Sequence, residues 1–115
     1  MNVVVVKGVL SRAPEVRELP SGGVVMNYEV TVRRADGPAE GVPVVRYDEA
    51  SSPLDVGAEV VVIGRVRRRF FRSGGATQSR TEVVADQVLP IGQRRRIRPA
   101  LARATSAVER WDEAG

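Results

Sequence analysis

The feature that most constrains the fold is a pair of long β-type segments joined by a short turn. Residues 58–72 and residues 78–91 both have the composition and spacing of extended strands, and the turn between them contains Gly74 and Gly75. Strands in globular domains usually have about five to six residues. The sequence therefore predicts a β-hairpin whose arms project beyond the domain that carries it.

The start of this hairpin is both basic and aromatic, with five arginines and two phenylalanines in residues 64–72. Side chains of a strand alternate between two faces, so Arg65, Arg67, Arg69 and Phe71 share one face. Guanidinium groups suit phosphates and an aromatic ring suits a base, so this face favours contact with a single-stranded nucleic acid. The alternative is a solvated face that keeps the hairpin soluble, with Phe71 as a core residue that caps the barrel end.

The charge of the chain is concentrated in its second half. The net charge is +4 over 115 residues, but residues 64–98 contain ten arginines and only two acids, Glu82 and Asp86. Of the 18 basic residues only Lys7 is a lysine. Arginine forks and stacks where lysine acts as a point charge. A high-GC genome would also favour arginine codons, but it does not explain the clustering.

Three further strands are expected before the hairpin, at residues 2–10, 24–34 and 42–47. The first is rich in valine on both faces, which predicts burial on both sides. Pro14 and Pro20 break the pattern after it. Five strands with a gap after the third predict an all-β fold, a five-stranded Greek-key barrel of the OB type with a long hairpin between its fourth and fifth strands. An SH3-like barrel is the structural alternative.

The chain divides into one barrel domain and a short carboxy-terminal part. We expect residues 1–92 to form the barrel, residues 93–98 a basic connector, and residues 99–115 an amphipathic helix that opens at Pro99, because proline suits the first helical position. The arginines of the connector allow two interpretations, a second phosphate contact or a solvated linker. The apolar stripe of the helix consists of Leu101, Ala104, Val108 and Trp111.

The residue inventory argues against an enzyme. The chain has no cysteine and no histidine, which removes disulfides, thiolate metal sites and the commonest general base. The only lysine lies in a valine-rich strand and the acids are scattered, so we expect neither catalysis nor a cofactor. No apolar run approaches the roughly 20 residues that span a bilayer, and the first residues do not resemble a signal peptide. A cytoplasmic protein without membrane contact is expected.

Two blocks of the sequence carry a family resemblance. The first is an apolar strand led by Asn2 and ending near Gly8, then residues 14–17 (Pro-Glu-Val-Arg) and a glycine turn at residues 22–23. The second runs from Gly57 through the hairpin and continues at residues 81–85 (Thr-Glu-Val-Val-Ala). In order and spacing, residues 2–92 resemble bacterial single-stranded DNA-binding proteins of the SSB family.

The resemblance implies an OB-fold that binds single-stranded DNA without sequence preference in replication, recombination or repair, at the nucleoid. It implies a homo-oligomer, with a tetramer favoured and a dimer possible. Phe71 falls where the family has a stacking tryptophan, and Tyr47 falls where it has a stacking phenylalanine. The phosphate contacts that it implies are Arg33, Arg34, Arg65, Arg67, Arg69, Arg72 and Arg80.

The chain also departs from the family, as a short and divergent member. Asp36 and Gly41 occupy the approximate places of two further stacking tryptophans. The acidic carboxy-terminal tip through which the family recruits partners has no counterpart, so recruitment by that route is doubtful. The alternative function is therefore an assembly protein with weak single-stranded DNA binding, like the primosomal proteins related to this family. RNA binding is a third possibility.

The remaining aromatic residues are assigned by their spacing. Tyr28 alternates with apolar neighbours and is expected in the core. Tyr47 is either a stacking platform or a residue that fills the barrel mouth. Phe70 and Phe71 point to opposite faces, so one can be core while the other is exposed, and we expect Phe71 to face outward. Trp111 is expected to be a packing residue of the helix.

Overall fold

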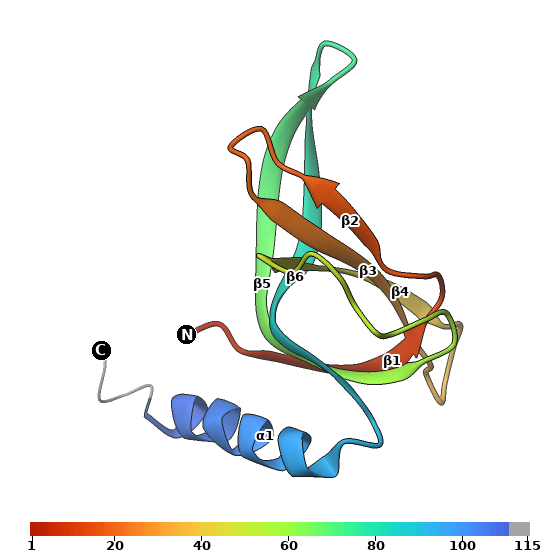
Figure 1. Cartoon of the computed structure of the whole chain (residues 1–115), viewed down its shortest axis with the longest axis vertical. Helices are drawn as coiled ribbons and strands as arrows, with labels where there is room; N and C mark the ends of the chain where they lie inside the picture. Colours follow the sequence, from red (N-terminus) through yellow and green to blue (C-terminus); the bar gives the residue numbers. More distant parts are fainter. Residues whose placement is uncertain (111–115) are drawn as a thin grey trace.

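The computed structural model of the chain describes residues 1–110, and Trp111 lies outside this range. Figure 1 shows strands curled into one barrel, a long hairpin projecting above it and a helix lying beneath it. The all-β class predicted from the sequence is confirmed. In chain order the elements are β1 (Val4–Leu10), β2 (Glu15–Glu18), β3 (Val24–Val32), β4 (Glu40–Tyr47), β5 (Glu59–Ser73), β6 (Ala76–Pro90) and α1 (Arg94–Glu109).

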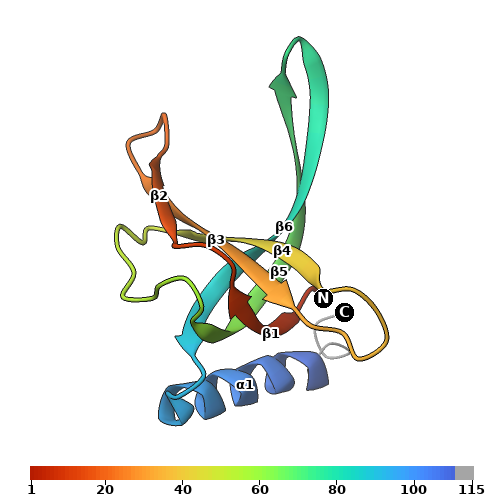
Figure 2. The same cartoon turned by 90° about the vertical axis from the view of Figure 1, so that its right-hand side faces the viewer.

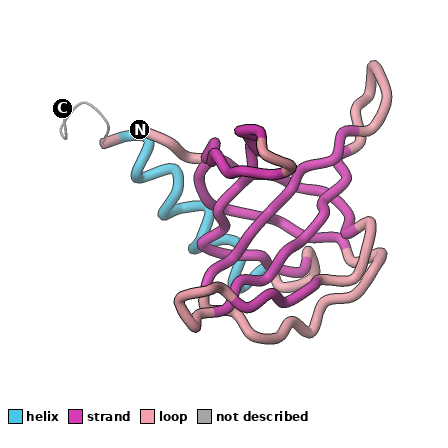
Figure 3. The backbone as a smooth tube through the Cα atoms, turned by 90° about the horizontal axis from the view of Figure 1, so that it is seen from above, coloured by secondary structure: helices cyan, strands magenta, loops and turns pink. Residues whose placement is uncertain are grey.

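The sheet closes into a barrel through β1. Its strand order is β1-β5-β6-β4-β3-β2, and β1 also pairs with β3, where Leu10 lies opposite Val30. All neighbouring strands are antiparallel except β4 and β6, which run parallel at Val44 and Val45. The chain passes from β4 across the barrel to β5, beside β1, and this is the Greek-key connection of an OB barrel. Figure 3 shows the strands enclosing one interior.

One strand is additional to the five that the sequence predicts. The segment between Pro14 and Pro20, predicted to break the pattern, contains β2, in which Glu15 lies opposite Asn27 of β3. Prolines lack an amide hydrogen and are tolerated at sheet edges. They therefore confine β2 to a four-residue edge strand with exposed side chains, and do not prevent pairing.

The barrel interior is a single apolar core. It is built mainly from valines of β3, β4, β5 and β6, with Leu10 and Met26. Tyr28 is buried there as predicted, and this burial raises the pKa of its phenol above the ordinary value. The chain is held closely at Gly8, where a Cβ atom would lie 2.5 Å from the carbonyl oxygen of Thr31.

The prediction that β1 is buried on both faces is wrong. Gly8 and Leu10 face the core, but Val5 and Val9 on the other face are 49% and 38% exposed. A closed barrel has one interior, so each strand buries one side unless another element covers the other. Among residues 1–110, nothing covers the outer face of β1 at Val5. The outer face of β1 is therefore an exposed surface of the barrel that carries valines.

Helix α1 begins earlier than predicted. Its first residue is Arg94, so the arginine run expected as a connector is helical and Pro99 lies inside the helix. The reason is tertiary packing. Ile97 and Ala100 are buried against β5 and β6, in a cluster with Leu89 of β6. This contact fixes the turn before Pro99 as helix, and α1 thereby covers part of the outer face of the barrel, at β5 and β6 (Figure 1).

The β5–β6 hairpin departs from the barrel at a β-bulge. The register shifts between Ile63 and Gly64, and a Cβ atom on Gly64 would lie 2.0 Å from the carbonyl oxygen of Val84. A bulge bends the strand and increases its twist, and the hairpin projects beyond it (Figure 2). The predicted tip is confirmed, since Gly74 and Gly75 both have positive φ, as a tight hairpin turn requires.

Within residues 1–110, no helix combines the length and the apolar character that a membrane span needs.

Candidate nucleic-acid interface

One buried carboxylate organises the arginines at the base of the hairpin. Glu82 of β6 is 1% exposed. Its Oε2 atom accepts a hydrogen bond of 2.6 Å from Nη2 of Arg67, and its Oε1 atom accepts one of 3.3 Å from Nε of Arg69. Nε of Arg80 lies 3.6 Å from the same Oε1 atom. Arg67, Arg69 and Arg80, called the arginine cluster below, therefore surround a single anion.

Strand register explains the convergence. Arg67 lies opposite Glu82, and Arg69 lies opposite Arg80, in the β5–β6 ladder. Side chains directly opposite on one face have Cβ atoms about 5 Å apart, so four charged side chains meet on one face of the hairpin. Three positive charges and one negative charge leave the cluster with a net charge of about +2 at neutral pH. Glu82 was not among the site residues predicted from the sequence, and the cross-strand register identifies it.

Arg67 links the hairpin to the end of β4. Its Nη2 atom also donates a hydrogen bond of 2.6 Å to the hydroxyl oxygen of Tyr47, and its guanidinium carbon lies 5.3 Å from the centre of that ring. The hydrogen bond to Glu82, and to a lesser extent that to Tyr47, raises the pKa of Arg67 above its ordinary value. Its Nε atom is buried and has no hydrogen-bond partner within residues 1–110.

The ring of Tyr47 lies at the surface next to the cluster. It is 38% exposed, so it does not simply fill the barrel mouth. On the same outer face of the sheet, Val25, Val45 and Val84 form a small buried group with Leu19 packed against them, and Val25 lies opposite Tyr47 in the β3–β4 ladder. The ring of Tyr47 therefore lies beside a buried apolar group.

Both phenylalanines of the hairpin face solvent. Phe71 is 37% exposed and the guanidinium carbon of Arg69 lies 5.1 Å from its ring centre. Phe70, on the other face, is 65% exposed and Arg68 lies over it in the same way. The hairpin extends beyond the barrel, so neither face has a core to receive a phenylalanine. Each ring carries a guanidinium group beside it.

The other sequence-predicted arginines lie apart from the cluster. Nη2 of Arg72 donates to the carbonyl oxygen of Gly75 at the hairpin tip. Arg65 is exposed nearer the barrel, on the side of α1. Arg33 and Arg34 follow the end of β3, and Arg34 pairs with Asp36 at 3.2 Å. That loop is at the far end of the β3–β4 ladder from Tyr47, which pairs near the start of β3.

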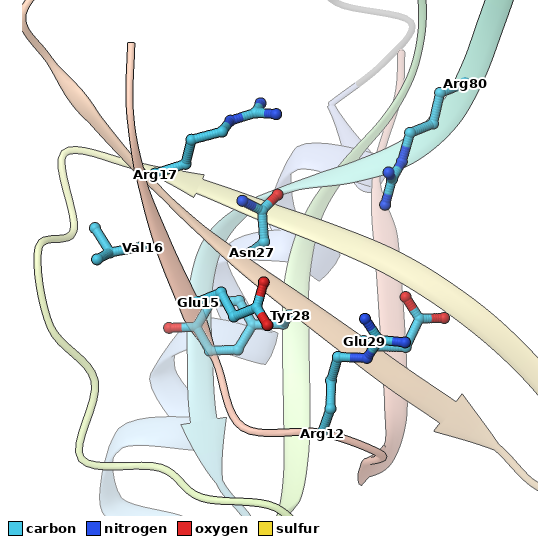
Figure 4. Close-up of a pocket in the computed structure, with 8 residues that line it drawn as sticks. All are labelled: Arg12, Glu15, Val16, Arg17, Asn27, Tyr28, Glu29 and Arg80. Atoms are coloured by element: carbon cyan, nitrogen blue, oxygen red, sulfur yellow. The ribbon is translucent and has the colours of Figure 1, made fainter.

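A polar groove lies beside the cluster, between β2 and the hairpin. It is a hollow of about 340 Å³ into which Arg17 of β2 and Arg80 of β6 project on either side of Asn27, as Figure 4 shows. Glu15 and Arg12 also line it. Arg17 was not predicted as a site residue, because its segment was not predicted as a strand.

These features place cations, two exposed rings and a groove on one side of the barrel. Residues 1–91 match the family model described as the single-strand binding protein family. The chain belongs to this family. Its members bind single-stranded DNA and are not enzymes, so single-stranded DNA is the partner that membership implies. The match ends at Ile91 and does not include α1. Within residues 1–110, no group of acidic side chains is placed to hold a metal ion.

Proposed function

We propose that the chain binds single-stranded DNA independently of sequence, with the arginine cluster on the phosphates and with Phe71 and Tyr47 stacked on bases. The observation that carries the proposal is that each ring lies against a guanidinium group tied to Glu82. Stacking on an aromatic ring tolerates every base, because every base has a π-face. This combination favours affinity without sequence readout.

The bound strand would run from the hairpin across Tyr47 toward the groove between β2 and the hairpin. Arg80 borders both the cluster and that groove, so it connects them. Arg72 at the tip extends the track outward. Arg33 and Arg34 lie on another side of the barrel and would meet only a strand that wraps around it.

Family membership supports a role in DNA replication, recombination or repair, in which transiently exposed strands are covered in the cytoplasm at the nucleoid. The test of the binding mode is a titration of labelled oligothymidine, mixed-sequence single strands and duplex of equal length. Similar affinity for the two single strands and much weaker affinity for duplex are expected. A preference for duplex contradicts the proposal. A matched RNA oligonucleotide decides between DNA and RNA.

We further propose a homo-oligomer, with a tetramer favoured over a dimer. Val5 and Val9 are exposed on β1, and one edge of that strand from Val4 to Lys7 pairs with no strand within residues 1–110. An unpaired strand edge is a template for pairing with another chain. The solution mass, measured by light scattering, should be two or four times that of the monomer. A monomer would contradict the proposal.

The same surface favours the second candidate function, an assembly protein with weak DNA binding. An assembly protein would use the exposed face of β1 to contact another chain, and would depend less on the hairpin rings that stack on bases. The two functions separate in one comparison, because replacing Val5 by lysine would disrupt assembly while leaving the arginine cluster unchanged. DNA affinity that is weak in the wild-type protein favours the assembly function.

A further inference from the structure

Helix α1, which lies outside the residues that match the family, forms a groove with β5. The family match ends at Ile91, whereas α1 begins at Arg94. Beside the contact that anchors the helix is a hollow of about 430 Å³ between α1 and β5, called the helix groove below. Arg65 of β5 lines one wall and Arg103 of α1 lines the other.

The construction of the helix groove keeps it open. The side of α1 that borders it presents the small residues Ala100, Ala104 and Ala107. On the opposite wall, Asn2 fixes the start of the chain against β5 through two hydrogen bonds to Val66. Its side-chain Nδ2 donates to the carbonyl oxygen of Val66 at 2.6 Å, and its Oδ1 accepts from the backbone nitrogen of Val66 at 2.9 Å. Larger side chains on α1 would fill this space.

The helix groove is continuous with the arginine cluster. Along β5, Ile63, Arg65 and Arg67 lie on one face, because side chains alternate and the bulge adds its extra residue to β6. Ile63 packs under α1, and Arg67 belongs to the cluster. Arg65 therefore bridges the two, and a polymer bound on the cluster enters the helix groove without changing face.

The charge of the helix groove suits a phosphate backbone. Within residues 1–110, neither Arg65 nor Arg103 has a carboxylate oxygen within 4.0 Å, although Asp86 also lines the hollow. Among the described side chains that line the helix groove, two guanidinium groups outweigh one carboxylate. Arginine frequently pairs with phosphate in bidentate geometry, which suits both of these guanidinium groups to a phosphate backbone.

We propose that the helix groove is a second contact for the phosphodiester backbone of the same single strand, held between Arg65 and Arg103. This inference rests on the proposed function. It lengthens the DNA segment that one chain covers by adding a contact from α1, which lies outside the residues that match the family. The contact is to the phosphates, so it adds affinity without base preference.

The first test compares R103Q with R98Q in the full chain. Arg98 is a matched control, since it is an exposed arginine of the same helix that lines a different hollow, with Lys7 and Ile91. The probes are oligothymidines of about 8 and about 25 nucleotides, one within and one beyond the site sizes of about 4–16 nucleotides of one OB domain. We expect R103Q to weaken binding of the longer probe by about fivefold and to make the slope of its salt dependence shallower by about 0.7. Binding of the shorter probe should be unchanged, and R98Q should bind both probes with nearly wild-type affinity. Equal losses in R103Q and R98Q, or no loss in either, would overturn the inference.

The second test measures occupancy directly. The chain has no cysteine, so one introduced thiol reacts alone. DNA of about 25 nucleotides should slow maleimide alkylation of A107C, in the helix groove, and should not slow that of A102C, on an exposed part of the helix. Equal alkylation rates with and without bound DNA would overturn the inference. If wild type binds neither probe, the proposed function itself has failed.

Discussion

At the scale of single residues, the interface depends on how cations and rings are held before DNA arrives. Glu82 is buried beneath three arginines, and two of these are positioned against Tyr47 and Phe71. A free arginine side chain loses about 2 kcal/mol of rotamer entropy when it is ordered. Part of that cost is already met in the folded hairpin, so the phosphates find ordered donors.

Replacing Phe71 by alanine should weaken single-stranded DNA binding by about tenfold or more, since stacking on one aromatic ring is worth about 1–3 kcal/mol. The ring is 37% exposed on a hairpin outside the core, so thermal stability should change little. The affinity is measured by fluorescence anisotropy with labelled oligothymidine. Phe70→Ala is the matched control on the opposite face, and an equal loss there would show that the two faces are not distinct.

Replacing Glu82 by glutamine should lower the affinity although it adds positive charge. The arginine cluster would lose its shared anion and its order, at a cost near one hydrogen bond to a charged group, or about tenfold in affinity. Circular dichroism verifies the fold of the variant. If Glu82 served only to offset charge, E82Q would bind DNA more tightly, and that result would refute a positioning role.

At the scale of elements, α1 is the part that this chain adds to the matched barrel, and its attachment is a small apolar contact. Ile97 is 7% exposed and packs with Val61, Ile63 and Leu89 on the outer face of the sheet. Removal of the contact would leave these apolar side chains open to water, and the helix groove would lose one wall.

Ile97→Ala should destabilise the protein by about 2–3 kcal/mol, within the range for truncating a buried isoleucine. Val108→Ala on the same helix, at a side chain that is 43% exposed, should cost much less. Urea unfolding followed by circular dichroism measures both. Equal and small costs would mean that α1 does not dock on the barrel through Ile97.

The elements also show how far sequence reasoning reaches. The hairpin, its glycine tip and the approximate positions of the other main strands along the chain were predictable, because alternation and turn residues are local signals. Strand β2 and the first turn of α1 were not, since proline rules describe the backbone alone and here pairing with β3 and burial of Ile97 decided the outcome. The grouping of Arg67, Arg69 and Arg80 around Glu82 needed the cross-strand register of the hairpin, which alternation along a single strand does not give.

At the scale of the whole molecule, the arginine cluster and the exposed face of β1 are two different surfaces of the barrel. The hairpin projects at one end with the arginine cluster at its base, and α1 lies at the other end (Figure 2). Val5 and Val9 are exposed on the outer face of β1. One chain can therefore meet DNA at the arginine cluster, which is formed by β5 and β6, and another copy along β1.

The central claim is that the hairpin side binds single-stranded DNA through phosphate neutralisation and stacking, and its most direct test is the salt dependence of oligothymidine affinity beside that of duplex. If about four arginines replace counterions, the logarithm of the binding constant should fall with the logarithm of salt concentration with a slope near −2.8. Stacking should leave measurable affinity for the single strand at high salt, where duplex binding has vanished. Affinity that ignores salt, or single-strand and duplex affinities that fall together to nothing, would contradict the account.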